Sequence, residues 1–256
     1  GWYRSGVTIT LAPEDEGGSG VAATYYRTNP SESFVRGTTI TLGDGEHQVE
    51  FYSVDGAGNE ESHTILSFSI DSVAPVTTAN LTPPEPDGLD GWYVSVVQVD
   101  FTVVESGSGG VTTYYSTDGG KEYVVGTQIT VSTDAEHVIW FYSVDAAGNE
   151  ETPKSVTFKI DRTAPVTTLM ADPPSPNGAN GWYISDVAIS LSAIDQGSGV
   201  ATTKSSIDGG ASFTETKEFT LGEGVHDVRF YSIDNAGNKE ETQSRVFRID
   251  KSAPNT

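Results

Sequence analysis

The chain has 256 residues, of which 36 are acidic and 14 basic, so its formal charge at pH 7 is -22. Such a surface repels nucleic-acid phosphates and anionic membranes, so we expect no nucleic-acid partner and regard cations as the expected ligands. The absence of cysteine excludes disulfides and thiolate chemistry, and no apolar run approaches the roughly 18 residues of a membrane span.

An internal repeat organises the whole sequence. Gly-Trp-Tyr begins at Gly1, Gly91 and Gly181, a spacing of 90 residues each time. Each copy continues with Phe-Tyr-Ser-(Val/Ile)-Asp, then Ala-Gly-Asn, and closes with Ile-Asp-x-x-Ala-Pro. This order predicts three domains, at residues 1–73, 74–163 and 164–252, and the start of a further repeat at 253–256.

The phase of the repeat leaves the first domain without its first strand. A full unit runs from Ala-Pro-Val-Thr-Thr through a Pro-Pro pair to the next Ile-Asp, and residues 1–73 lack that opening. We expect the chain to belong to a longer array, or neighbouring repeats or copies of the chain to supply the missing strand.

Each repeat is expected to consist of β-strands, because apolar and polar residues alternate and no helical period appears. The clearest alternation places Val97, Val99, Phe101 and Val103 on one face, and Val187, Ile189, Leu191 and Ala193 in the third repeat. Further strands are predicted at 112–117, 122–125, 127–132, 137–145, 155–161 and 166–170. About seven strands per repeat predict an all-β fold of three tandem Ig-like or fibronectin III-like β-sandwich domains in an elongated array.

The motifs resemble those of bacterial and archaeal surface Ig-like tandem repeats of the OmpL47 type. The resemblance rests on Gly-Trp-Tyr, on residues 195–200 and 114–120, and on the closing Ile-Asp-x-x-Ala-Pro. It implies an extracellular or cell-surface location, since such modules serve as spacers in adhesins, surface proteins and secreted glycosidases. The third repeat departs from the pattern, with Lys204-Ser205 in place of a Tyr pair.

Acidic turns form the first candidate site. In an Ig-like sandwich two loops, between strands B and C and between F and G, share the end where the preceding repeat arrives. We expect the Asp that closes one repeat to approach those loops of the next. The first group is Asp71, Glu105, Asp145, Asn149 and Glu150, and the second is Asp161, Asp195, Asp234 and Asn238.

Oxygen ligands of this kind suit Ca²⁺, a hard cation that takes about six to eight of them. The sequence therefore suggests a calcium site in each group. The first repeat carries the matching residues without an upstream partner, at Asp15, Asp55, Asn59 and Glu60. The alternative is that these side chains only hydrogen-bond the turn backbone, with a positive φ at Gly148 and no ion.

An aromatic platform is the second candidate site. Ile139 and Phe141 are expected to face the core, which directs Trp140 and Tyr142 outward, and Tyr114 is expected beside them. Such a patch would stack on sugar rings or on a protein partner. The alternative is ordinary pairing of aromatic side chains across neighbouring strands.

Two further residue types recur once per repeat. Trp2, Trp92 and Trp182 are expected to cap a core or to pack against a neighbouring domain. His47, His137 and His226 are expected to make structural hydrogen bonds, because no second histidine lies nearby to complete a zinc site.

We expect no catalytic residues, because the same acidic residues recur in turns in three copies, whereas an active site needs an asymmetric constellation. The first functional hypothesis is an extracellular structural array, forming a stalk, surface layer or filament. The alternatives are an adhesion or carbohydrate-binding module that contacts glycans or surface proteins, and a spacer in a secreted glycosidase.

Overall fold

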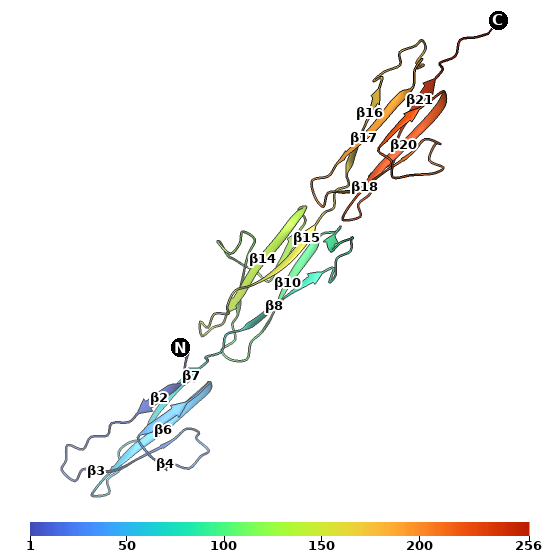
Figure 1. The fold of residues 1–256 in the computed structure, drawn as a ribbon. Coiled ribbons are helices and arrows are strands. Elements are labelled where there is room, and N and C mark those ends of the chain that lie inside the picture. The colour runs from blue at the N-terminus through green and yellow to red at the C-terminus, as the bar shows by residue number, and fades with distance from the viewer. Residues whose placement is uncertain (256) are drawn as a thin grey trace. The chain divides into compact units, whose positions relative to one another are not determined.

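A computed structural model describes residues 1–255 of the chain as strands, turns and loops (Figure 1). Thr256, which closes the predicted start of a further repeat, lies outside the described residues. No helix of a length and apolarity able to cross a membrane occurs among residues 1–255. The prediction of an all-β chain is confirmed.

The chain forms two compact units. The first comprises residues 1–80, 100–128 and 139–156, and the second comprises 81–99, 129–138 and the residues from 157 on. The first sequence repeat belongs wholly to the first unit and the third repeat wholly to the second. The domain boundaries inferred from the repeat stay a prediction.

The first repeat folds into two sheets. Its strands are β1 (Trp2–Tyr3), β2 (Val7–Thr10), β3 (Val21–Arg27), β4 (Val35–Arg36), β5 (Thr39–Leu42), β6 (Gly45–Asp55) and β7 (Thr64–Ile70). One sheet has the order β1-β7-β6-β3-β4, and the other contains only β2 and β5. Ile40, Val49 and Ile70 are its buried apolar side chains.

The second repeat adds β8 (Val76–Thr82), β9 (Trp92–Tyr93), β10 (Val97–Val104), β11 (Thr112–Ser116), β12 (Val124–Val125), β13 (Gln128–Val131), β14 (Ala135–Val144) and β15 (Lys154–Ile160). The sheets run β13-β10-β8 and β12-β11-β14-β15-β9. Val97, Val99 and Phe101 are buried while their neighbours in β10 are more exposed, which confirms the predicted alternation.

The third repeat contains β16 (Val166–Asp172), β17 (Val187–Ile194), β18 (Val200–Ser206), β19 (Glu218–Leu221), β20 (Gly224–Asp234) and β21 (Gln243–Ile249). One sheet has the order β16-β17-β19 and the other β18-β20-β21. The core between them contains Tyr183, Val187, Ile189, Leu191, Leu221, Val228, Phe230, Phe247 and Ile249. Each such side chain contributes about 1.5 to 3 kcal/mol by its burial.

In the second and third repeats, the Gly-Trp-Tyr motif places its tyrosine, not its tryptophan, in the core. Tyr93 and Tyr183 are each 3% exposed, whereas Trp92 is half-buried with the Lys159 ammonium 4.7 Å from its ring centroid. Trp92 and Tyr93 pair in parallel with β15, so their side chains point to opposite faces. Sequence analysis did not predict this short strand.

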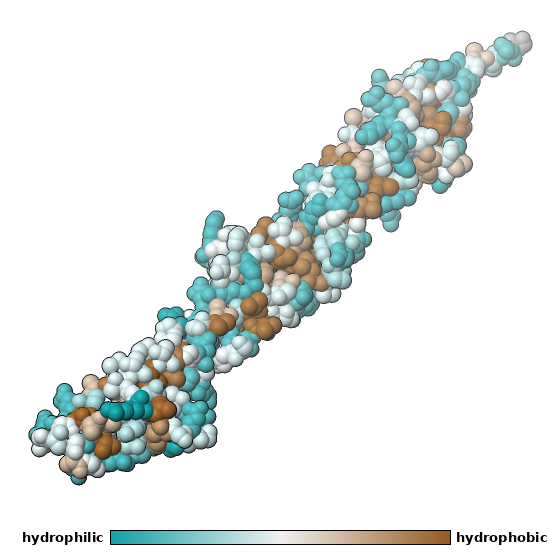
Figure 2. All heavy atoms as spheres, turned by 60° about the horizontal axis from the view of Figure 1, so that its bottom comes forward, coloured by the Kyte–Doolittle hydropathy of each residue, from teal (hydrophilic) through white to brown (hydrophobic). Residues whose placement is uncertain are grey.

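The recurrent histidines make the expected structural hydrogen bonds. The Nε2 atoms of His47, His137 and His226 lie 2.7, 2.8 and 2.9 Å from the carbonyl oxygens of Gly43, Thr133 and Gly222. Each bond closes the turn that precedes the long strand of its repeat. On the surface in Figure 2, apolar and polar side chains are interspersed.

Candidate metal centre

The Asp that follows the last strand of a repeat is held rigidly in both groups. Asp71 follows β7 and is 1% exposed, and its backbone N–H donates to the carbonyl of Tyr3 at 2.8 Å. Asp161 follows β15, is fully buried at 0% exposure, and donates in the same way to Tyr93 at 2.9 Å. One carboxylate oxygen of each also accepts the N–H two residues later, at 3.2 Å.

The loop that follows β10 closes over Asp71. The Ser108 N–H donates to Asp71 Oδ2 at 2.7 Å, and a Cβ atom on Gly107 would lie only 2.4 Å from that carboxylate. The third repeat has the same arrangement, since Ser198 donates to Asp161 Oδ2 at 2.6 Å. Only glycine therefore fits at Gly107, which gives a physical reason for the Gly-Ser pair in these loops.

The turn after β14 supplies the next carboxylate. The Asn149 N–H and Nδ2 donate to Oδ1 and Oδ2 of Asp145, both at 2.8 Å, while Nδ2 also donates to the Asp71 carbonyl at 2.9 Å. Asn238 repeats these bonds with Asp234 and with the Asp161 carbonyl. Gly148 has a φ of 90°, as the turn alternative requires.

Two clusters of three carboxylates result. In the group Asp71, Glu105 and Asp145, and in the group Asp161, Asp195 and Asp234, one oxygen of each residue lies within 4.8 Å of the others. Among residues 1–255, no lysine, arginine or histidine forms an ion pair with any of these six carboxylates. Three convergent carboxylates supply oxygen ligands of the kind that Ca²⁺ prefers.

The buried charges affect one another. Burial, together with the charges of Asp161 and Asp234, raises the pKa of Asp195 above its ordinary value. Burial also acts to raise the pKa of Asp71, but hydrogen bonds donated by Ser108 and Val73 outweigh it and hold that pKa below its ordinary value. The N–H donors thus offset part of the electrostatic cost of burying Asp71.

The remaining predicted ligands do not join these clusters. Glu150 is exposed, and after burial its charge contributes to the raised pKa of Tyr142. In the first repeat, Asn59 bonds Asp55 as its counterparts do, and Asp15 accepts the Gly17 N–H at 2.8 Å. Glu60 instead lies 3.1 Å from Nε2 of His63. Among the residues that the structure describes, no group of three carboxylates forms at the turn of the first repeat.

The aromatic side chains of the second candidate site lie together on the outer face of the sheet. Tyr114 and Tyr142 face each other on β11 and β14, with ring centroids 5.1 Å apart and planes 13° from parallel. Tyr123 meets Tyr142 edge-on, with ring centroids 4.9 Å apart, and Trp140 pairs with Ser116 two residues farther along the strands. The two tyrosine rings thus cover each other, as cross-strand pairing predicts.

Sequence analysis did not identify the groups that orient the clusters. These groups are Ser108 and Ser198, whose N–H groups bind the closing Asp, and Gly107 and Gly197, which lie against it. The Gly-Ser pair is visible in the sequence of both loops. The Asp71 carboxylate that it contacts lies 37 residues before Ser108, so the sequence did not indicate the contact.

Comparison with known proteins gives one family match. Residues 193–251 match the family described as a bacterial Ig-like domain. No curated protein matches the sequence.

Several solved structures resemble the chain at low identity. A bacterial ice-binding adhesin structure is 16% identical over 97% of this chain and 92% of its own, with a TM-score of 0.35. Fibronectin(III)-like modules of Clostridium thermocellum CbhA are 13% identical over 62% and 87%, with a TM-score of 0.31. Three domains of the bacteriophage RB49 outer capsid protein Hoc are 11% identical over 98% and 96%, with a TM-score of 0.30.

Likenesses this low carry no information about function. The family match lies in the third repeat, and the landmarks of that repeat recur in the other two. The chain is all-β, and residues 193–251 resemble a bacterial Ig-like domain.

Proposed function

We propose that the chain is an extracellular structural array of Ig-like modules, a segment of a stalk, surface layer or filament. In this proposal Ca²⁺ binds at the two carboxylate clusters, where it joins the Asp that closes one repeat to the loops of the next. The resemblance to surface repeats and the match of residues 193–251 to a bacterial Ig-like domain support the extracellular assignment.

One observation carries the calcium part of the proposal. Asp71, Asp145, Asp161 and Asp234 are at most 6% exposed, and each belongs to a cluster with no cationic side chain paired to it. Buried like charges are costly unless a cation or a proton neutralises them. A bound divalent cation would turn that repulsion into attraction among three chain segments.

The chemistry of the donors favours calcium over magnesium. Each cluster brings together carboxylates from three segments that are far apart in the sequence. Ca²⁺ accepts irregular sets of about six to eight oxygens, whereas Mg²⁺ requires near-octahedral geometry and retains water. Turn formation alone accounts for Asp145 and Asn149, but it does not require Glu105 or Asp71 to converge on them.

Thermal unfolding of the full chain tests the proposal. Added Ca²⁺ should raise the unfolding temperature, excess chelator should lower it, and Mg²⁺ or Na⁺ at matched ionic strength should have a smaller effect. Saturation at about 100 times the Kd stabilises a site by about 2.7 kcal/mol. Superimposable melting curves with calcium and with chelator would refute the calcium assignment.

The adhesion alternative has weaker support. A sugar-binding platform presents free ring faces, whereas the Tyr114 and Tyr142 rings stack on each other. The proposal therefore assigns no glycan site and no catalytic reaction, and it names neighbouring repeats or other copies of the chain as partners. Binding to a glycan array that is lost on Trp140→Ala would favour the adhesion alternative instead.

A further inference from the structure

A buried threonine hydroxyl in the third repeat lies against a buried carboxylate. Thr167 on β16 and Glu240, which lies between β20 and β21, are 3% and 8% exposed. The Thr167 hydroxyl donates to Glu240 Oε1, and the Thr167 N–H donates to Oε2 at 3.0 Å. A hydroxyl that donates to a carboxylate is the arrangement in which a general base activates a nucleophile.

A second hydroxyl supports the oxygen of Thr167. Ser232 Oγ lies 2.6 Å from Thr167 Oγ1, and the Ser232 N–H donates to Glu240 Oε1 at 2.6 Å. Because the Thr167 hydroxyl donates its proton to Glu240, the Ser232 hydroxyl is the donor in the pair with Thr167. This donor would stabilise the negative charge that develops on Thr167 Oγ1 as its proton leaves.

The side-chain amide of Gln243 lies at the same carboxylate. Its Nε2 donates to the Thr167 carbonyl at 3.1 Å and to Glu240 Oε2 at 3.3 Å. Both partners are acceptors, so the amide nitrogen, and not the amide oxygen, faces them. Glu240 therefore contacts the Thr167 hydroxyl with one oxygen and the Gln243 amide nitrogen with the other.

The second repeat has the network without the amide. Its Thr77 N–H donates to Glu151, and the Thr77 hydroxyl lies 2.6 Å from Ser143 Oγ. Lys154 begins the last strand of that repeat, as Gln243 does in the third. The Lys154 ammonium donates to the Thr77 carbonyl and pairs with Glu151. The second repeat thus has the hydroxyl and the carboxylate, but no carbonyl carbon for the hydroxyl to attack.

From this geometry we propose that the third repeat forms an ester bond between Thr167 and Gln243 by its own chemistry. Thr167 Oγ1 attacks Gln243 Cδ while its proton passes to Glu240. The Cδ–Nε2 bond then breaks, the nitrogen keeps the electron pair and takes a proton from Glu240, and ammonia leaves. One C–O bond replaces one C–N bond, so the step needs no oxidant, reductant or co-reactant.

The folded chain favours this reaction in two ways. The strands hold the hydroxyl, the base and the amide together before the reaction, which removes the entropy cost of bringing them into place. Thr167 and Glu240 are shielded from water, which protects the ester from hydrolysis, whereas Gln243 is exposed, so ammonia leaves directly into solvent.

The bond would join the two sheets of the third repeat. Thr167 lies on β16 in the sheet β16-β17-β19, and Gln243 begins β21 in the sheet β18-β20-β21. Tension along the chain would pass through the ester and bypass residues 168–242. The reaction occurs once per chain, and it depends neither on calcium nor on the location of the protein.

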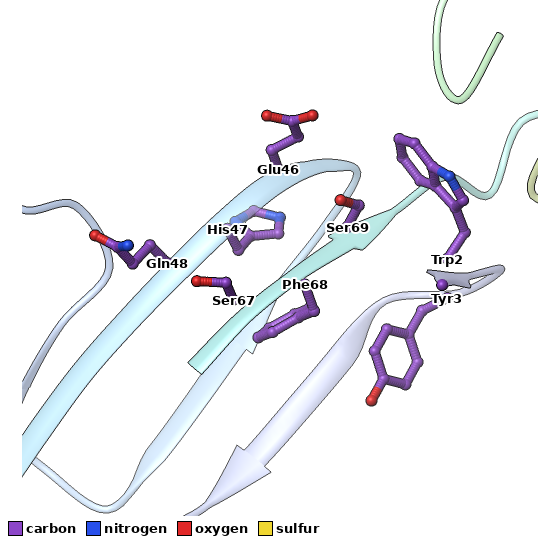
Figure 3. A pocket seen from close by; sticks show the side chains of 9 residues that line it. Trp2, Tyr3, Glu46, His47, Gln48, Ser67, Phe68 and Ser69 are labelled. Carbon is purple, nitrogen blue, oxygen red and sulfur yellow. The ribbon is translucent and has the colours of Figure 1, made fainter. Parts of the chain in front are cut away.

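Other hydroxyl groups near possible bases lack this arrangement. Figure 3 shows Ser67, Ser69, Glu46 and His47 around one pocket of the first repeat. His47 Nε2 lies 2.7 Å from the Gly43 carbonyl oxygen instead. Within residues 1–255, no hydrogen bond joins the hydroxyl of Ser67 or Ser69 to His47 or Glu46.

Intact-mass spectrometry of the denatured full chain tests the proposal. The measured mass should be below the sequence mass by one ammonia, about 17 Da. One bond per chain is expected, because Lys154 and Thr64 begin the last strands of the other repeats. Trypsin cleaves after lysine and arginine, so it should release residues 163–204 and 240–245 as one linked species. Mild alkali should hydrolyse the ester and separate the two peptides.

Variants identify the two partners of the bond. Gln243→Lys removes the attacked carbon and reproduces the combination that the second repeat already accommodates, so it should have its full sequence mass. Thr167→Val should also have its full mass. Thr168→Val, which changes the exposed neighbouring residue, should keep both the ammonia loss and the linked species. These masses are read from denatured chains, so the test does not depend on the stability of a variant.

Three results would overturn the proposal. The first is a parent chain with its full sequence mass. The second is a loss of ammonia without the linked species, which cyclisation of Asn177 or Asn180 before its glycine would give. The third is a loss that persists in Gln243→Lys. None of these results bears on calcium binding, which the unfolding experiment tests separately.

Discussion

Neutralising one carboxylate of the second cluster should have opposite effects with and without calcium. Asp195 is the half-buried member of the cluster with Asp161 and Asp234, and its Oδ1 accepts the Gly199 N–H at 2.6 Å. Asp195→Asn keeps the size and an acceptor oxygen but removes the charge. Without a cation the variant should be more stable than the parent chain, and with calcium it should gain less.

The magnitude follows from the separation of the charges. Two carboxylates 4.8 Å apart repel by about 3.5 kcal/mol at an effective dielectric constant of about 20. Asp195 faces two such charges, but solvent screens a half-buried group. We therefore expect Asp195→Asn to raise the free energy of unfolding in chelator by about 1 to 3 kcal/mol. For a repeat of this size, each kcal/mol moves the unfolding temperature by about 4 to 8 °C.

Differential scanning calorimetry in chelator and then in calcium measures both effects on the full chain. In chelator, Asp195→Asn should raise the transition of its repeat by at least about 4 °C. The matched control is Glu241→Gln, which removes one exposed charge from the same repeat. It should leave the unfolding temperature unchanged, both in chelator and in calcium. A variant that is destabilised in chelator, or that keeps the full calcium response, would refute this reasoning.

Three further changes test the fold and its polar contacts. Gly107→Ala should destabilise the chain by about 2 to 3 kcal/mol in chemical denaturation, because its Cβ would lie 2.4 Å from the Asp71 carboxylate and displace the loop. Thr167→Val should cost about 2 kcal/mol in the same assay, because Glu240 loses a buried donor. Hydrogen bonds to acidic side chains raise the pKa of His63 above 6.5, so the stability it provides is complete below that pH. This stability declines as the pH rises through the raised pKa of His63. His63→Gln should therefore abolish the fall in denaturation midpoint over that pH range.

Matched controls separate these effects from general damage. Gly43→Ala adds a Cβ that meets no atom within 4 Å, and Thr168→Val changes the exposed neighbour of Thr167. Both control substitutions should leave the free energy of unfolding almost unchanged. Equal losses in a variant and its control would contradict the assigned contact, and a midpoint independent of pH in the parent chain would contradict the role of His63.

The fold was accessible from the sequence because its signals are local. Alternation at Val97, Val99 and Phe101 identified a strand and its buried face. The Trp-Tyr pair shows where local reasoning fails. Residue type alone suggested that Trp92 caps a core or packs against a neighbouring domain, but the parallel pairing of β9 with β15 decides that Tyr93 is the buried residue of the pair.

The candidate site was accessible only in part. The convergence of Asp71, Glu105 and Asp145 follows from the loop order of an Ig-like sandwich, so it could be inferred. Whether Glu150 is exposed or joins the cluster depends on the conformation of its turn. The fit of Gly107 against Asp71 depends on distances of a few tenths of an ångström. Such details require coordinates.

Direct calorimetric titration of Ca²⁺ into the metal-free full chain tests the central claim most closely. The two three-carboxylate clusters predict two ions per chain, with one lost in Asp145→Asn and the other in Asp234→Asn, while Asp55→Asn in the first repeat leaves the count unchanged. An absence of binding heat, or a third ion lost with Asp55→Asn, would contradict the account.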